Sequence, residues 1–145
     1  MSSVTIKSYR KERERGIMSG LDKSMGVVGA MVERQAKQNV ITQSARSPWQ
    51  KTGELASNIG HEVKVEGGTI SVTVGNWRGM PAQKYVPYGR ALELGHKQKP
   101  GQFVEAIGKR LVASDVPPYP WLFPALEAKK SDIIEALKGH AFSIL

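Results

Sequence analysis

The side chains best suited to chemistry in this chain are three histidines, His61, His96 and His140. They are far apart along the sequence, and none belongs to a His-Glu-x-x-His or comparable metal-ligand pattern. The absence of cysteine excludes disulfides, thiolate nucleophiles and zinc-thiolate sites. The sequence also lacks a Gly-x-x-x-x-Gly-Lys phosphate loop, a Gly-x-Gly-x-x-Gly turn and a Gly-x-Ser-x-Gly elbow, and its acidic residues form no recognisable pair. We therefore expect no catalytic, metal or cofactor site, and a binding or structural protein rather than an enzyme.

Positive charge is the strongest signal in the composition. The net charge is +8, which favours association with polyanions or with an acidic protein surface. Residues 1–16 are interpreted as a charged N-terminal arm that contacts DNA or an acidic partner through Lys7, Arg10, Lys11, Arg13 and Arg15. A small basic DNA-binding protein is the leading alternative to a structural role. A nuclease ranks third, because it needs a cluster of carboxylates that only folding could bring together in this chain.

Length and composition predict one domain. The chain has 145 residues, of which 40% are hydrophobic and 23% charged, and this suffices for a core of its own. No apolar run is long enough to cross a membrane, and residues 1–16 lack the apolar middle of a signal peptide. We expect a single domain over residues 17–138, followed by a C-terminal tail of residues 139–145.

Two helices and a hairpin should form the frame of this domain. Apolar residues step by three or four positions from Leu21 to Ala36, which predicts a helix over residues 19–39. Valine and isoleucine alternate with polar residues on both sides of a Gly-Gly turn, which predicts a β-hairpin over residues 61–74. The same helical spacing recurs after Pro124 and predicts a final helix that ends near residue 137.

A proline-rich strap precedes the final helix. Pro117, Pro118 and Pro120 disfavour helical structure before Pro124, which can itself occupy the first turn of a helix. The strap carries three aromatic residues, Tyr119, Trp121 and Phe123. Large aromatic side chains dominate the energetics of cores and interfaces, so these rings should fix the final helix to the rest of the chain or to a partner.

Two segments between the hairpin and the strap have the character of partner contacts. The loop Trp77-Arg78-Gly79-Met80 mixes apolar and basic residues with glycine, which predicts an exposed tip. Apolar residues over 103–111 predict a short inserted helix. The candidate partner interface comprises Trp77, Arg78, Met80 and Phe103. Between these segments, Arg90 and Glu93 are spaced to form a surface ion pair on one helical face.

Several motifs, taken in order, resemble the small tail-component or tail-completion proteins of long-tailed bacteriophages, which act at the joint between head and tail. The string Val32-Glu33-Arg34-Gln35-Ala36-Lys37-Gln38-Asn39 is similar to the end of that family's first helix. The other matching positions are Thr52, Gly53, Leu55, Ile59, Tyr85, Tyr88, Glu93, Gly95, Pro120, Trp121, Leu122, Pro124, Ala125 and Leu126. Tyr119 and Trp121 replace the usual arginine and phenylalanine of the strap, and the segment before the strap is longer than in the family.

The resemblance implies an α+β fold in which an antiparallel sheet, including the hairpin, is packed by a long N-terminal helix and a C-terminal helix. It also implies a structural virion protein of the phage neck that is assembled in the host bacterial cytoplasm. We expect such a protein to bind no cofactor and to contact no membrane. Such proteins form rings, usually hexameric, at the end of the tail tube, beside the tail terminator and the connector and around packaged DNA. Tail termination and head closure are alternative roles in the same region. A closed ring requires two different complementary patches on each subunit.

Overall fold

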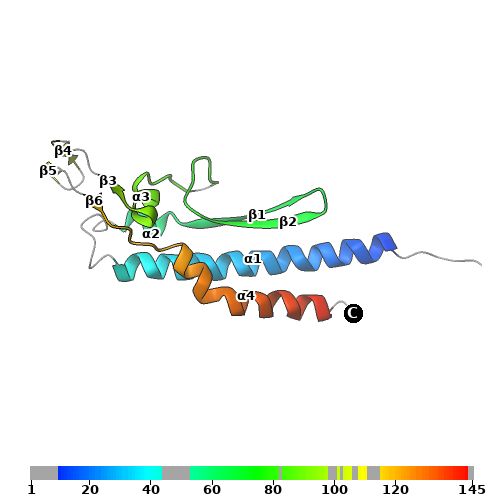
Figure 1. Cartoon of the computed structure of the whole chain (residues 1–145). Helices are drawn as coiled ribbons and strands as arrows, with labels where there is room; N and C mark the ends of the chain where they lie inside the picture. The colour runs from blue at the N-terminus through cyan, green and yellow to red at the C-terminus, as the bar shows by residue number, and fades with distance from the viewer. Residues whose placement is uncertain are drawn as a thin grey trace, which may run out of the picture.

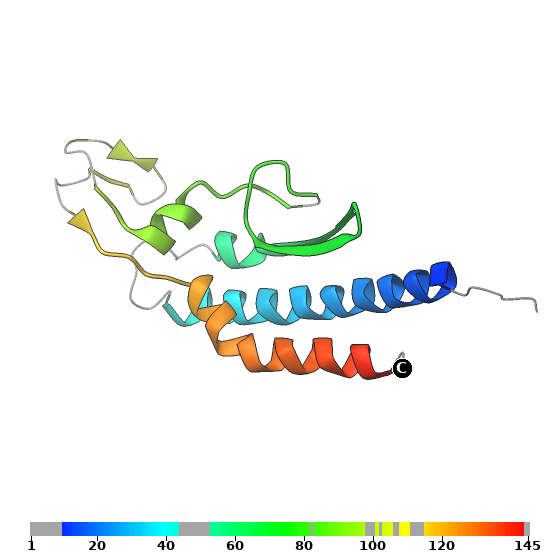
Figure 2. The same cartoon turned by 45° about the vertical axis from the view of Figure 1, so that its right-hand side comes forward.

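The computed structural model of the chain describes residues 10–43, 53–81, 83–97, 101, 103–105, 108–110 and 115–143. Its elements are α1 (Arg10–Gln43), α2 (Glu54–Ser57), β1 (Gly60–Glu66), β2 (Thr69–Gly75), α3 (Tyr88–Leu94), β3 (His96–Lys97), β4 (Phe103–Val104), β5 (Lys109–Arg110), β6 (Asp115–Val116) and α4 (Phe123–Ser143). The fold is α+β, as expected, and α1 lies between the hairpin and the antiparallel α4 (Figure 1). Figure 2 shows the same three layers from a second direction.

The first helix is longer than the apolar pattern predicted. It begins at Arg10 rather than near Ser19, so residues 10–15, expected in an arm, lie on its first turns. Lysine, arginine and glutamate are good helix formers, and Arg10 Nε donates to Glu14 Oε1 at 2.8 Å one turn later. These turns are exposed to solvent and extend beyond the tip of the hairpin (Figure 1).

The predicted hairpin is confirmed. β1 and β2 pair antiparallel along their whole length. Gly67 and Gly68 have φ values of 54° and 79°, as a two-residue type I′ turn requires. The face of the hairpin that carries His61 and Val72 packs on α1 at Gly29, where an added Cβ would lie 2.5 Å from the His61 ring. This glycine therefore allows the close approach of helix and sheet.

The expected helix over residues 103–111 is wrong. β4 pairs antiparallel with β5 instead. Gly108 adopts a φ of 61° and its N–H donates to the Glu105 carbonyl at 3.2 Å, so the chain reverses where a helix would continue. Ile107 and Leu111, which contributed to the apolar pattern, lie outside the described residues. The β3–β6 ladder joins this small hairpin to the strap, and the hairpin projects from one end of the molecule (Figures 1 and 2).

The core lies where α1, α2, α3 and the beginning of α4 meet. Its buried residues are Val32, Ala36, Val40, Leu55, Ala56, Ile59, Val86, Leu92, Trp121 and Ala125. The predicted final helix is confirmed, although it begins at Phe123 and continues to Ser143, into the segment expected to be a tail. Ile133 of this helix packs against the core cluster.

Candidate functional site

The carboxylate of Glu93 closes the beginning of α4. Its Oε2 accepts the backbone N–H groups of Trp121 at 2.7 Å and Leu122 at 2.9 Å, and its Oε1 accepts that of Phe123 at 2.9 Å. The first N–H groups of a helix have no partner within the helix, and a negative charge there also interacts favourably with the helix dipole. Glu93 thus bonds the backbone of the strap instead of forming the predicted surface pair with Arg90, whose side chain is exposed.

Trp121 is the anchor of the strap. Its side chain is 3% exposed, and its indole Nε1 donates to the Gly89 carbonyl at 3.0 Å. Asn39 Nδ2 donates to the Trp121 carbonyl at 3.0 Å, which ties the strap to α1 as well as to α3. The prediction that strap aromatics fix the final helix is therefore confirmed for Trp121. Phe123 is 63% exposed, so it does not dock on the rest of the chain, and its contact with a partner stays a prediction.

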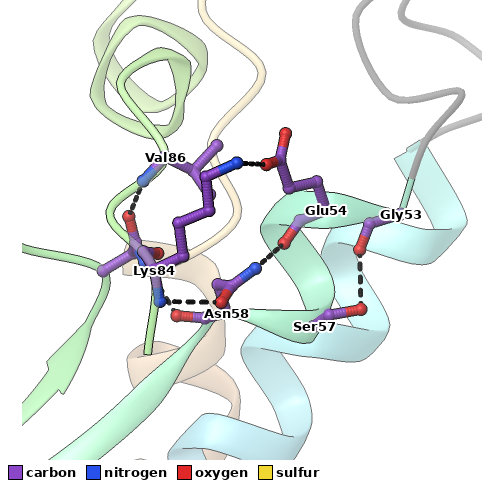
Figure 3. Close-up of polar contacts among 7 residues, drawn as sticks. Gly53, Glu54, Ser57, Asn58, Lys84 and Val86 are labelled. Atoms are coloured by element: carbon purple, nitrogen blue, oxygen red, sulfur yellow. Dashed lines mark hydrogen bonds and ion pairs between the residues drawn. The ribbon is translucent and has the colours of Figure 1, made fainter. Parts of the chain in front are cut away.

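A second group of hydrogen bonds joins α2 to the segment that leads into α3 (Figure 3). Asn58 Nδ2 donates to the Glu54 carbonyl at 2.8 Å, and Asn58 Oδ1 accepts the Lys84 N–H at 2.9 Å. Lys84 Nζ also donates to Glu54 Oε1 at 2.6 Å, and this hydrogen bond raises the pKa of the lysine. Asn76 accepts the Val86 N–H at 2.7 Å. The segment that leads into α3 has no regular secondary structure, so side chains rather than a neighbouring strand accept its backbone N–H groups.

The residues that carry the family resemblance gather around the strap. Leu55, Ile59, Trp121 and Ala125 are buried in the core, Tyr88 and Leu122 pack against it, Tyr85, Glu93, Gly95, Pro120 and Pro124 are half-buried, and Gly53 and Leu126 are exposed. Thr52 lies outside the described residues. Gly95 adopts a φ of 72°, and an added Cβ would lie 2.8 Å from the Val116 carbonyl at the end of β6. These positions build the junction of α2, α3 and α4 rather than a polar cavity.

An apolar groove runs along β2. Its first part, with a volume of about 320 Å³, lies between α1, β2 and the beginning of α4. Its apolar lining includes Val28, Val72, Val74, Leu122, Phe123 and Leu126. Its second part, of about 360 Å³, shares Val74 and Leu122 with the first and continues past Trp77 to α3. The sequence pattern did not indicate this groove, because residues far apart along the chain form it.

The candidate partner loop after β2 is only partly exposed. Met80 is 7% exposed and its terminal methyl group lies against Gly60, so its predicted place on an exposed tip is wrong. Trp77 is half-buried beside the groove. The Arg78 guanidinium is exposed and lies over the Tyr85 ring, 5.1 Å from its centroid, a cation–π contact. Trp77 and Arg78 remain available as surface contacts.

The other candidate contacts lie at opposite ends of the molecule. Phe103 is 53% exposed on the projecting β4–β5 hairpin, opposite Arg110 across the ladder. Arg10, Lys11, Arg13 and Arg15 are exposed at the beginning of α1. Lys7 lies outside the described residues. These four cationic residues, which were predicted to belong to an N-terminal arm, therefore lie on the first turns of α1.

A polar cluster joins α1 to β1, where His61 meets the carboxylate of Glu33. Glu33 Oε2 lies 2.5 Å from His61 Nδ1, and Glu33 Oε1 accepts from Lys37 Nζ at 2.5 Å. Burial raises the pKa of Glu33, but the hydrogen bonds from Lys37 and His61 outweigh it and hold the pKa below its ordinary value. The cluster fixes the hairpin on the helix.

Within the described ranges, no group of three or more histidine, aspartate or glutamate side chains is arranged to hold a metal ion. Across those same residues, no helix combines the length and the apolar character needed to span a bilayer. The chain matches no protein-family model, and neither a curated protein nor a solved structure is significantly similar to it.

Proposed function

We propose that this chain is a ring-forming structural subunit of the neck of a long-tailed bacteriophage, where it completes the tail and joins it to the DNA-filled head. One observation supports this proposal most strongly: three motifs that resemble the tail-completion family meet in space around the strap. Leu55, of the motif at residues 52–59, and Trp121, of the strap, are buried in one cluster. Glu93, of the motif at residues 85–95, accepts hydrogen bonds from the strap backbone. Motifs that specify a shared fold are expected to converge in this way, whereas chance matches have no reason to meet.

The surfaces of the subunit suit a ring. A closed ring repeats one heterologous contact, so each subunit needs a donor patch and a different acceptor patch. The apolar groove along β2 provides a concave acceptor, with Phe123 and Leu126 exposed at its wall. Phe103, on the projecting hairpin, and Trp77 with Arg78, after β2, provide further contact points. We propose a hexamer at the end of the tail tube, in contact with the tail terminator and the connector.

A small basic DNA-binding protein is the second candidate, because four cationic residues are exposed on the first turns of α1. Within a neck ring these residues would face packaged DNA or an acidic neighbouring ring. The two functions respond differently to salt. Binding that depends on phosphate contacts weakens steeply as the salt concentration rises, whereas a mainly apolar contact between subunits persists.

Labelling of purified phage particles tests the neck position. Gold-conjugated antibodies against this chain should mark the junction of head and tail, and quantitative mass spectrometry should find the chain in a ring-like number of copies per particle. Label along the tail or on the capsid, or absence of the chain from washed particles, would overturn the proposal. Absence combined with salt-sensitive binding of DNA would favour the DNA-binding function instead.

A further inference from the structure

We propose that neighbouring subunits exchange a strand: residues 3–8 of one copy lie in the groove of the next copy and add a third strand beside β2. This inference rests on the proposed ring function and identifies the contact that holds the ring together. The occupant is the segment Ser3-Val4-Thr5-Ile6-Lys7-Ser8, which precedes α1 and lies outside the described residues. The acceptor is the edge of β2 together with the apolar wall formed by α1 and α4.

The acceptor edge is open and apolar. In the part of the chain that the structure describes, β2 pairs only with β1. An edge strand presents backbone N–H and C=O groups that can pair with another chain. Val72 and Val74 line the groove on the α1 side of this edge, whereas β1 is covered at its beginning by Met80 and Gln83, which lie against Gly60. The edge of β2 is therefore the favourable place for an added strand.

The chemistry of residues 3–8 fits this edge. Val4 and Ile6 alternate with Thr5 and Lys7, and β-branched residues favour extended structure. In an added strand, Val4 and Ile6 would face the groove. Thr5 and Lys7 would then lie on the polar outer face, with Ser71 and Thr73 of β2. Main-chain hydrogen bonds would supply affinity, and the two apolar side chains would supply specificity, as in other cases of strand addition.

The geometry of α1 directs the exchange to a second copy. Val28, which lines the groove, lies about 27 Å along α1 from Arg10, at about 1.5 Å per residue. The six residues from Arg10 back to Val4 span at most about 21 Å when fully extended. Val4 therefore cannot reach the groove of its own chain while α1 keeps its first turns. In a ring, each subunit can donate this segment to one neighbour and accept it from the other.

Cysteine cross-linking within phage particles tests the exchange, because the chain has no cysteine of its own. The double variant Thr5→Cys and Thr73→Cys places both sulfur atoms on the polar outer face of the extended sheet. The variant Thr5→Cys with Ser71→Cys covers the neighbouring register. The matched control is Thr5→Cys with Lys64→Cys, since Lys64 lies opposite Ser71 on the far strand β1. Adjacent strands lie about 4.8 Å apart, so a cysteine two strands away is beyond disulfide reach.

Particles complemented with each variant would be oxidised and separated on a non-reducing gel. Strand exchange predicts a ladder of cross-linked subunits for at least one test variant and monomers for the control. A second variant, Val4→Asp with Ile6→Asp, should lower the yield of joined particles at least tenfold, whereas Thr5→Asp should leave the yield unchanged. A single intramolecular cross-link, or full joining by the Val4→Asp and Ile6→Asp variant, would overturn the exchange. Particles that contain the chain but give no ladder would refute the exchange alone, and particles without the chain would refute the neck function as well.

Discussion

Glu93 Oε2 accepts the backbone N–H of Trp121 at 2.7 Å, across a separation of 28 residues. A side chain of α3 thereby caps the beginning of α4, and the indole of the capped residue bonds back to α3 at Gly89. This reciprocal pair of bonds makes one rigid junction from the strap and two helices. The apolar groove lies directly beside it, because Glu93 and Leu122 also line that groove. A fixed junction next to an open groove suits a subunit that must present a preformed surface to its neighbour.

Replacement of this cap should weaken the fold. Glu93→Gln removes the negative charge and places an amide donor among backbone donors, so we expect a loss of about 1–3 kcal/mol in the free energy of unfolding. Urea unfolding measures the loss. Glu127→Gln, at an exposed position on the same helix, is the control and should stay within about 0.5 kcal/mol of the parent chain. Equal effects of the two substitutions would show that the cap contributes little.

Two glycines of α1 should respond in opposite directions to the same substitution. Gly26 has nothing within 4 Å of an added Cβ, so Gly26→Ala should stabilise the chain by about 0.5–1 kcal/mol through helix propensity. Gly29→Ala should destabilise it by about 1–3 kcal/mol, because the methyl group would meet His61 and Val72 at 2.5 and 2.9 Å. Thermal unfolding of both variants measures the difference. Stabilisation by Gly29→Ala would contradict the observed approach of the hairpin to α1.

Lowering the pH should remove the contribution of ionised Glu33 to the free energy of unfolding. Its folded-state pKa lies below the ordinary value of 4.5, so the unfolded chain takes up a proton first as the pH falls. The stabilisation is therefore fully present above pH 4.5 and is lost as the pH falls through the folded-state pKa. Glu33→Gln should be less stable than the parent chain at neutral pH and nearly equal to it once the pH lies below the folded-state pKa of Glu33. A difference that stays constant across this range in urea unfolding would show that the carboxylate charge is not responsible.

Substitution of an exposed aromatic residue should affect assembly, whereas substitution of a buried one should affect folding. Phe103→Ser should leave the free energy of unfolding within about 0.5 kcal/mol, because the side chain is 53% exposed, yet weaken association between subunits. Trp121→Ala should instead cost about 3–5 kcal/mol in unfolding, since the ring is 3% exposed. Urea unfolding and sedimentation velocity of each variant distinguish the two effects. Unchanged sedimentation of Phe103→Ser would remove this residue from the proposed interface.

The periodic parts of the fold could be predicted from the sequence. The hairpin has a two-residue alternation and a Gly-Gly turn, and both helices have apolar positions at helical spacing, all of which are local signals. The beginning of α1 was misplaced because residues 10–17 carry no apolar stripe and hold their helix through charged helix formers. The segment 103–111 was misassigned because four apolar residues fit a helical period, while Gly108 reverses the chain.

The junction and the groove could not be predicted in this way. The role of Glu93 depends on a contact with Trp121, 28 residues later in the sequence, whereas spacing alone suggested a pair with Arg90. Met80 looked exposed because its loop contains glycine and proline, but it packs on Gly60. The resemblance to tail-completion proteins marks Glu93, Gly95 and Trp121 without assigning them a structural role. The aromatic residues of the strap independently predicted that Trp121 fixes the final helix.

Electron microscopy of lysates from a phage that lacks this gene tests the joining role most directly, with complementation by the intact chain as the control. The proposed function predicts DNA-filled heads beside free tails of normal length, and joined particles after complementation. Overlong tails would point to tail termination, and empty or leaking heads to closure of the head. Normal infectious particles in the absence of the chain would contradict any role in the phage neck.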